Sequence, residues 1–166
     1  MTAPAPRKAT ALPPTRHADD LFTWVKEQCA LLRTGSLKEL DHRLAALELS
    51  HSGNEIRNKL QRSIASLAQH LLKWDYQPER RSRSWEQTIC ERRQRIEDVL
   101  EQNPSLRPAL SERVSRGYAT GRRRALVETK LPKAAFPTDC PYTFDEMMGR
   151  EIEFVPPPAR RRGKGR

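Results

Sequence analysis

The chain of 166 residues carries 31 lysines and arginines against 21 acidic residues, a formal net charge of +10, and 36% of it is hydrophobic. This length predicts one domain with room for tails, and no apolar run approaches the roughly 18 residues that a membrane-spanning helix needs. No apolar leader opens the sequence, and its three cysteines, Cys29, Cys90 and Cys140, fit no zinc or redox spacing. We therefore expect a protein of the reducing cytoplasm, neither secreted nor embedded in a membrane.

The excess positive charge is concentrated at the two ends of the chain. Residues 1–16 hold three cationic residues and four prolines with no acid, and residues 156–166 hold five cationic residues with no acid. Both compositions predict disordered tails, the first rich in Pro and Ala and the second rich in Arg. About +2 is left for residues 17–155, which we expect to form a single helical domain. A body so near neutrality supports nucleic-acid binding only weakly, and the tails either grip an anionic partner or simply aid solubility.

The first half of the chain has helical periodicity. Apolar residues recur at three- and four-residue steps from Leu21 to Leu32, and Gly35 predicts the end of that helix. Ser36-Leu-Lys-Glu39 has the spacing of a capping box and predicts the start of a second helix. Ser52-Gly-Asn-Glu55 repeats the pattern and predicts the start of a third, which runs through Leu71.

The second half continues the pattern after Pro78, which lies in a predicted loop. Ser84-Trp-Glu-Gln87 predicts the cap of a helix that ends near Asn103-Pro104. A fifth helix is expected over residues 108–129, with Gly117 and Gly121 on or beside its apolar stripe, where missing side chains permit close helix approach. Thr143-Phe-Asp-Glu146 predicts a short C-terminal helix. Because no segment alternates with period two, we predict an all-α fold, a bundle of about five main helices plus the short one.

Several sequence motifs occur in a fixed order between about Asp20 and Arg150. They are Ala30-Leu-Leu-Arg-Thr-Gly35, His70-Leu-Leu-Lys-Trp74, Tyr76-Gln-Pro-Glu-Arg-Arg-Ser-Arg-Ser-Trp85, Pro104-Ser-Leu-Arg-Pro108, Glu128-Thr129 and Phe136-Pro-Thr-Asp-Cys-Pro-Tyr-Thr143. On this ordered set the chain resembles the bacterial "domain of unknown function 29" family. The resemblance implies an all-helical fold and no agreed activity. The segment Asp41–Ser50 carries fewer carboxylates than the family pattern, with Glu48 retained.

The segment from His70 to Trp85 contains the main candidate site. Arg80, Arg81 and Arg83 lie just before the predicted cap at Ser84, where free amides and the helix dipole attract anions. Three aromatic side chains able to stack on bases lie in the same segment, namely Trp74, Tyr76 and Trp85. The alternative is a structural corner built from His70, Pro78 and Ser84, with the tryptophans closing the end of the bundle and the arginines paired to acids. The structural interpretation is favoured.

Other groups of residues give only weak evidence for a metal-binding or catalytic site. Glu48-Leu-Ser-His51 has the Glu-x-x-His spacing that helical di-metal proteins use, but no second such pair follows. His70 lies between Leu67 and Leu71, which predicts a histidine of the bundle interior. No glycine-rich phosphate loop is present, and we predict no cofactor.

Three functions follow as hypotheses. The first is a non-enzymatic binding or regulatory module that acts through a protein partner. The second is a nucleic-acid or other anion-binding protein that uses Arg80–Arg83 and the basic tails. The third is an enzyme with a Glu/His site around Glu48, His51 and His70.

Overall fold

The computed structural model describes residues 15–156. The predicted tails, 1–16 and 156–166, lie outside the described residues except for Thr15, Arg16 and Pro156. The helices, in order, are α1 (Leu21–Thr34), α2 (His42–Tyr76), α3 (Arg83–Gln102), α4 (Leu110–Thr129) and α5 (Phe144–Gly149), with short 3₁₀ helices η1 (Pro78–Arg80), η2 (Pro104–Ala109) and η3 (Lys133–Ala135).

The all-α class and the short C-terminal helix are confirmed, and residues 15–156 contain no strand. None of the helices in this range is long and apolar enough to span a membrane. The chain divides into two compact units, one up to Gly53 and one from Asn54 onward, and α2 contributes residues to both. We call them the N-terminal unit and the C-terminal unit. The single domain over 17–155 stays a prediction.

The N-terminal unit contains α1 and the first turns of α2. Asp20 caps α1 by accepting a hydrogen bond from the amide of Thr23, and Gly35 ends it with φ of +72°. The amide of Ser36 donates to the carbonyl of Leu31 at 2.9 Å, which completes a left-handed helix ending. The helix start predicted at Ser36 is therefore wrong, because this residue belongs to the turn that closes α1. Asp41 caps α2 instead, accepting from the amide of Leu44 at 3.0 Å.

Helix α2 runs for 35 residues without a break, so the second and third predicted helices are one. The cap predicted at Ser52 is wrong. The Ser52 hydroxyl donates back to the carbonyl of Glu48 at 3.1 Å, a bond that a serine makes in a helix interior. Ser52 and Gly53 are poor helix formers, which explains why the local pattern resembles a helix start although the backbone continues through it.

Two glycine-to-alanine substitutions of opposite expected sign test this local account. Gly53→Ala should raise the free energy of unfolding by about 1 kcal/mol, since Gly53 lies inside α2 and a Cβ there meets no atom within 4 Å. Gly35→Ala should lower it by about 1 kcal/mol, because a left-handed φ is strained for alanine. Urea denaturation of both variants checks the signs. A loss of stability in Gly53→Ala would contradict a continuous α2.

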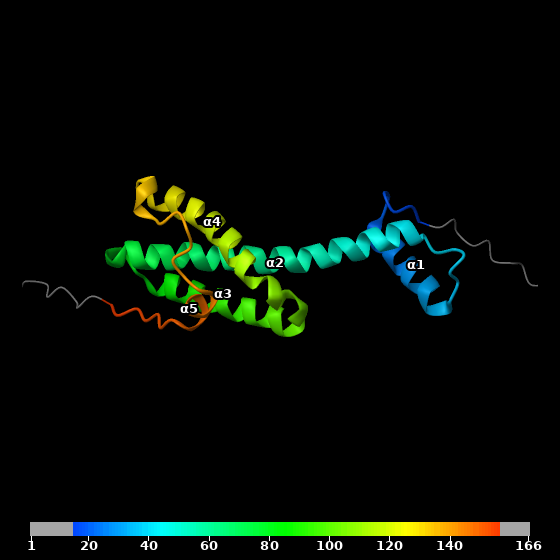
Figure 1. Cartoon of the computed structure of the whole chain (residues 1–166). Coiled ribbons are helices and arrows are strands. Elements are labelled where there is room, and N and C mark those ends of the chain that lie inside the picture. The colour runs from blue at the N-terminus through cyan, green and yellow to red at the C-terminus, as the bar shows by residue number, and fades with distance from the viewer. Residues whose placement is uncertain (1–14, 157–166) are drawn as a thin grey trace, which may run out of the picture. The chain divides into compact units, whose positions relative to one another are not determined.

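The C-terminal unit is built from the later turns of α2 with α3, α4 and α5 (Figure 1). All four helices contribute side chains to one apolar core. Its largest fully buried side chains are Leu60, Ile64, Leu67, Leu71, Leu72, Ile89, Ile96, Leu100, Tyr118, Phe136 and Met147. The α2 members from Leu60 to Leu71 recur at four- and three-residue steps and so line one side of the helix, which Leu72 widens. The predicted close approach of α4 is confirmed. A Cβ built on Gly121 would lie 2.5 Å from the backbone oxygen of Ala65 in α2.

The later helix starts follow the sequence closely, with one correction. Ser82 caps α3, its side chain accepting from the amide of Trp85, so the cap predicted at Ser84 lies two residues too late. The turn η1 ends just before Ser82, whose extended backbone suits a cap. The fifth predicted helix corresponds to α4, which begins at Leu110 after η2. The capping box at Thr143 is confirmed, with Glu146 making the reciprocal bond.

Candidate functional site

The corner between α2 and α3 holds the arginine–aromatic segment. Trp74 is buried in the core, and the guanidinium of Arg81 lies over its ring at 5.1 Å from the centroid. Arg81 Nε also donates to the Trp74 carbonyl at 2.9 Å. Tyr76 is partly exposed and meets the ring of Phe136 edge-on. Arg81, Trp74 and Tyr76 therefore hold the corner together through ring and backbone contacts.

The other two arginines of the segment reach solvent. Arg80 and Arg83 are exposed, and neither forms an ion pair with any residue in the described range. The candidate anion residues are thus divided between two roles. Arg81 is committed to the fold, while Arg80 and Arg83 flank the start of α3 with free guanidinium groups. Pro78 begins η1, the turn that links α2 to α3.

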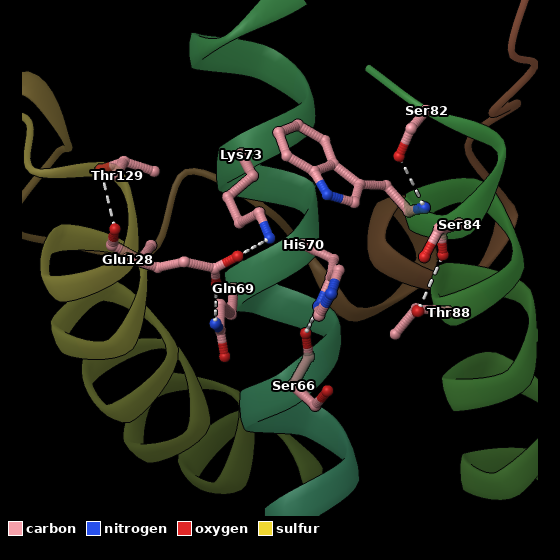
Figure 2. A network of polar contacts seen from close by, with 11 residues as sticks. Ser66, Gln69, His70, Lys73, Ser82, Ser84, Thr88, Glu128 and Thr129 are labelled. Atoms are coloured by element: carbon pink, nitrogen blue, oxygen red, sulfur yellow. Dashed lines mark hydrogen bonds and ion pairs between the residues drawn. The ribbon is translucent and has the colours of Figure 1, made fainter. Parts of the chain in front are cut away.

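A polar network joins α2, α3 and α4 next to this corner (Figure 2). Lys73 of α2 is only 3% exposed, and its Nζ donates to the Glu128 carboxylate of α4. The same ammonium lies over the ring of Trp85 at 4.3 Å from the centroid. Gln69 donates to the second carboxylate oxygen of Glu128 at 2.7 Å. Residues from three of the ordered sequence motifs thus meet around one buried charge.

The electrostatics of this network follow from burial and hydrogen bonding. Partial burial raises the pKa of Glu128, but the hydrogen bonds from Lys73 and Gln69 outweigh it, so the pKa lies below the ordinary 4.5. Burial lowers the pKa of His70 below its ordinary 6.5, and the charge of Lys73 acts in the same direction. His70 Nδ1 lies 2.9 Å from the carbonyl of Ser66 in the preceding turn of α2. The side chain is half-buried beside the Lys73–Glu128 pair.

His70 should make the stability of the protein depend on pH. Because its pKa is lower in the folded than in the unfolded chain, its contribution is complete above about pH 6.5 and is lost as pH falls through the folded value. We expect the free energy of unfolding to fall between pH 7 and pH 5.5, and His70→Gln to flatten that slope. Urea titrations at several pH values measure it, with His42→Gln at an exposed site as the control. An unchanged slope in His70→Gln would contradict the assignment.

A second polar cluster fastens the C-terminal segment to α2. The carboxylate oxygen Oδ2 of Asp75 accepts from the Tyr142 hydroxyl at 2.6 Å and from Arg150 Nη1 at 3.0 Å. Burial and the hydrogen bond to Asp75 raise the pKa of Tyr142 well above its usual range. The phenol therefore stays protonated and acts as a donor. Tyr142 and Arg150 lie 67 and 75 positions after Asp75 in the sequence, so no local sequence pattern predicts this cluster.

The segment between α4 and α5 is held by α4. Tyr118 donates to the carbonyl of Pro137 at 2.6 Å, and burial raises the pKa of this phenol to about 12. Arg122 donates to the carbonyls of Phe136 and Lys133. Packing and backbone hydrogen bonds thus account for the start of the Phe136–Thr143 motif.

The Glu48–His51 pair lies in the N-terminal unit and gains a third member. His17 Nε2 lies 2.8 Å from Glu48 Oε1, and His51 Nδ1 lies 3.7 Å from the same oxygen. His17 also meets the ring of Trp24 edge-on. Across residues 15–156, no group of three or more His, Cys, Asp or Glu side chains has the arrangement of a metal site. The contacts instead fasten the segment before α1 to α2.

The N-terminal unit leaves a large apolar surface open. Within residues 15–53 only Trp24 and Gln28 are buried. Seven large apolar side chains of the unit remain between 37% and 74% exposed, including Leu37 and Leu47. We call the other five the apolar face: Leu21, Phe22, Val25, Leu32 and Leu49. At 100° per residue, the four on α1 fall within an arc of about 100°. A groove of about 200 Å³ runs between α1 and α2, and Val25, Leu32 and Leu49 line it.

Sequence reasoning missed this face, although a signal for it exists. The interpretation of residues 21–32 as one apolar stripe assumed that the stripe is covered. The stripe is covered only in part. Trp24 and Gln28 are buried, while Leu21, Val25 and Leu32 beside them remain partly exposed. At 100° per residue, the stripe from Trp24 round to Phe22 spans an arc of about 160°, which is wider than the roughly 100° that a helix needs to cover a core.

The comparisons with known proteins identify a family. The family model described as "Domain of unknown function DUF29" matches residues 17–152. No curated protein and no solved structure matches the chain. The matched range contains all five helices, the Lys73–Glu128 network and the apolar face. The chain therefore belongs to the DUF29 family, whose model covers nearly the whole of its described structure.

Proposed function

We propose that this protein is a non-enzymatic helical binding module of the cytoplasm that acts through a protein partner. The observation that carries the proposal is the apolar face of the N-terminal unit. Val25, Leu32 and Leu49 of this face line one groove, and Leu21 and Phe22 lie on the same stripe of α1. A large exposed apolar patch rimmed by polar residues marks an interaction site. Here Lys26 and Arg33 flank the face on α1.

The chemistry of the face defines its partner. The groove between α1 and α2 is lined mainly by apolar atoms of α1 and α2 side chains, and its one charged residue, Glu48, is held by His17 and His51. A groove between two helices accepts the apolar stripe of a third helix. We therefore expect the partner to present an amphipathic helix whose contacting residues are uncharged.

Binding measurements with matched variants test the proposal. Leu49→Glu places a charge in the groove, where the wild-type side chain is 73% exposed and so contributes little to the fold of the unbound chain. Val127→Glu is the control, since Val127 is 80% exposed on α4. The partner is purified from lysate, identified and remixed with purified protein. Leu49→Glu should weaken its affinity by at least about 30-fold, and Val127→Glu should leave it unchanged. Partners that bind Leu49→Glu as tightly as wild type would overturn the proposal.

Anion binding is the second candidate, favoured by the exposed guanidinium groups of Arg80 and Arg83. The corner supplies free cations beside the start of α3, whereas Arg81 is engaged with Trp74. Affinity for single-stranded nucleic acid should fall steeply with salt and should fall further in an Arg80→Ala, Arg83→Ala double variant. Arg123→Ala, at another exposed arginine, is the control. Equal affinity in wild type and the double variant at low salt would remove this candidate.

A further inference from the structure

We propose that the helix occupying the groove of the N-terminal unit is α1 of a second copy of this chain, so that two N-terminal units form a four-helix bundle. This inference rests on the proposed function and names its partner. The two halves of the interface are both present on one unit. The exposed stripe of α1 supplies an apolar ridge, and the groove between α1 and α2 supplies its receptor.

A two-fold pairing uses both halves at once. In a symmetric dimer the same patch serves both copies, so the ridge of each copy enters the groove of the other. Two helical hairpins that meet in this way give four helices around a shared core. Trp24 and Gln28 are the buried residues of α1. In the dimer they would lie beneath the shared core, of which each copy alone supplies only half.

The charges of the face fit a copy of itself. The apolar face contains no ionisable residue, and the one in the groove, Glu48, already contacts His17 and His51. Two identical faces can therefore meet without like-charge repulsion at their centre, while the cations Lys26 and Arg33 stay at the solvated rim, with the Lys26 ammonium over the Phe22 ring.

The area of the face matches the needs of a homodimer. A specific interface buries about 800 Å² per partner, and about 65% of a homodimer interface is apolar, so about 500 Å² of apolar surface is needed. The five side chains are between 37% and 74% exposed. Given about 150–250 Å² for a fully buried aromatic side chain and somewhat less for an aliphatic one, they offer on the order of 500 Å². Polar side chains at the rim supply the remainder.

Light scattering and sedimentation of the full chain test the oligomeric state. Wild type should be a dimer, Leu49→Glu should raise the dimer dissociation constant by at least about 100-fold, and Val127→Glu should not change it. The helical circular dichroism of each variant reports whether it is folded. A wild type that is monomeric at all concentrations, or a dimer that Leu49→Glu leaves intact, would overturn the inference.

Cysteine alkylation of the wild-type chain gives a second readout without any substitution. Cys29 lines the groove, and Cys90 is exposed on α3 and serves as an internal reference. Alkylation of Cys29 relative to Cys90 should slow as the protein concentration rises. A Cys29-to-Cys90 alkylation ratio that does not change with protein concentration would count against a second copy. A segment of the same molecule that filled the groove would protect Cys29 equally at every dilution.

The two proposals fail differently. If the wild type is a monomer but another protein binds in a Leu49-dependent way, self-association is overturned and the binding module stands. If neither a second copy nor any other protein binds in a way that Leu49→Glu weakens, both the self-association and the binding-module proposals are overturned.

Discussion

Replacing Gly121 by alanine should lower the free energy of unfolding by about 3 kcal/mol, because the new methyl group has no space between α2 and α4. Its Cβ would lie 2.5 Å from the Ala65 oxygen and 2.9 Å from the Gln69 nitrogen, both backbone atoms of α2. A helix backbone cannot move aside as a side chain can, so α4 must shift. The higher helix propensity of alanine offsets only about 1 kcal/mol of the strain. Urea denaturation followed by circular dichroism measures the change.

Two other glycines provide matched controls for Gly121→Ala. At Gly117 the closest atom, 2.5 Å away, is Cγ2 of the Ile64 side chain, and at Gly149 nothing lies within 4 Å. Gly117→Ala should therefore cost less than Gly121→Ala, and Gly149→Ala should cost little. Equal losses at Gly121 and Gly149 would show that α2 and α4 do not cross as closely as described.

Removing the carboxylate of Glu128 should lower the free energy of unfolding by about 2 kcal/mol, since it leaves the buried ammonium of Lys73 without its partner. Breaking a fully buried ion pair costs about 3–5 kcal/mol, whereas an exposed pair contributes about 1 kcal/mol or less. The Lys73–Glu128 pair lies between these limits, because the side chain of Lys73 is 3% exposed and that of Glu128 is 49% exposed. Glu128→Ala, measured by urea denaturation, tests the value.

The two partners of this ion pair differ in burial, so removing each one in turn should change the free energy of unfolding by different amounts. Lys73→Met removes the buried charge and keeps an apolar chain against Trp85, while the Glu128 carboxylate left behind can be hydrated. Lys73→Met should thus be less destabilising than Glu128→Ala. Glu112→Ala, which breaks the exposed Glu112–Arg116 pair of the same helix, should cost well under 1 kcal/mol. A larger loss for Lys73→Met than for Glu128→Ala would mean that Lys73 stabilises the fold mainly through its own contacts.

The fold was predictable where local chemistry and burial agree. The Thr143 capping box and the Gly117–Gly121 approach are confirmed, because cap geometry and a missing side chain act over a few residues. The Ser36 and Ser52 boxes were wrong for a different reason. A capping box is a pattern of four residues, and the competing structures extend beyond it: the turn that ends α1 uses Ser36, and a continuous α2 passes through Ser52.

The candidate site was predictable only in part. The motif allowed for arginines that hold the corner, but which of Arg80, Arg81 and Arg83 does so depends on the side of the turn that each one faces. The Lys73–Glu128 and Asp75–Tyr142 contacts join residues 55 and 67 positions apart, where no periodicity applies. The apolar face was missed because periodicity marks a side of a helix as apolar and does not show whether another element covers it.

Site-specific photo-crosslinking in living cells tests most directly whether the apolar face binds another polypeptide. A photoreactive amino acid is placed at Leu49 in the groove and, in a separate variant, at Val127 on α4. We expect an adduct from position 49 that disappears when Phe22 is changed to glutamate, and none from position 127. Mass spectrometry of the adduct then identifies the bound chain. The absence of an adduct at position 49, or adducts of equal yield at both positions, would contradict the proposal that the N-terminal unit is a docking surface.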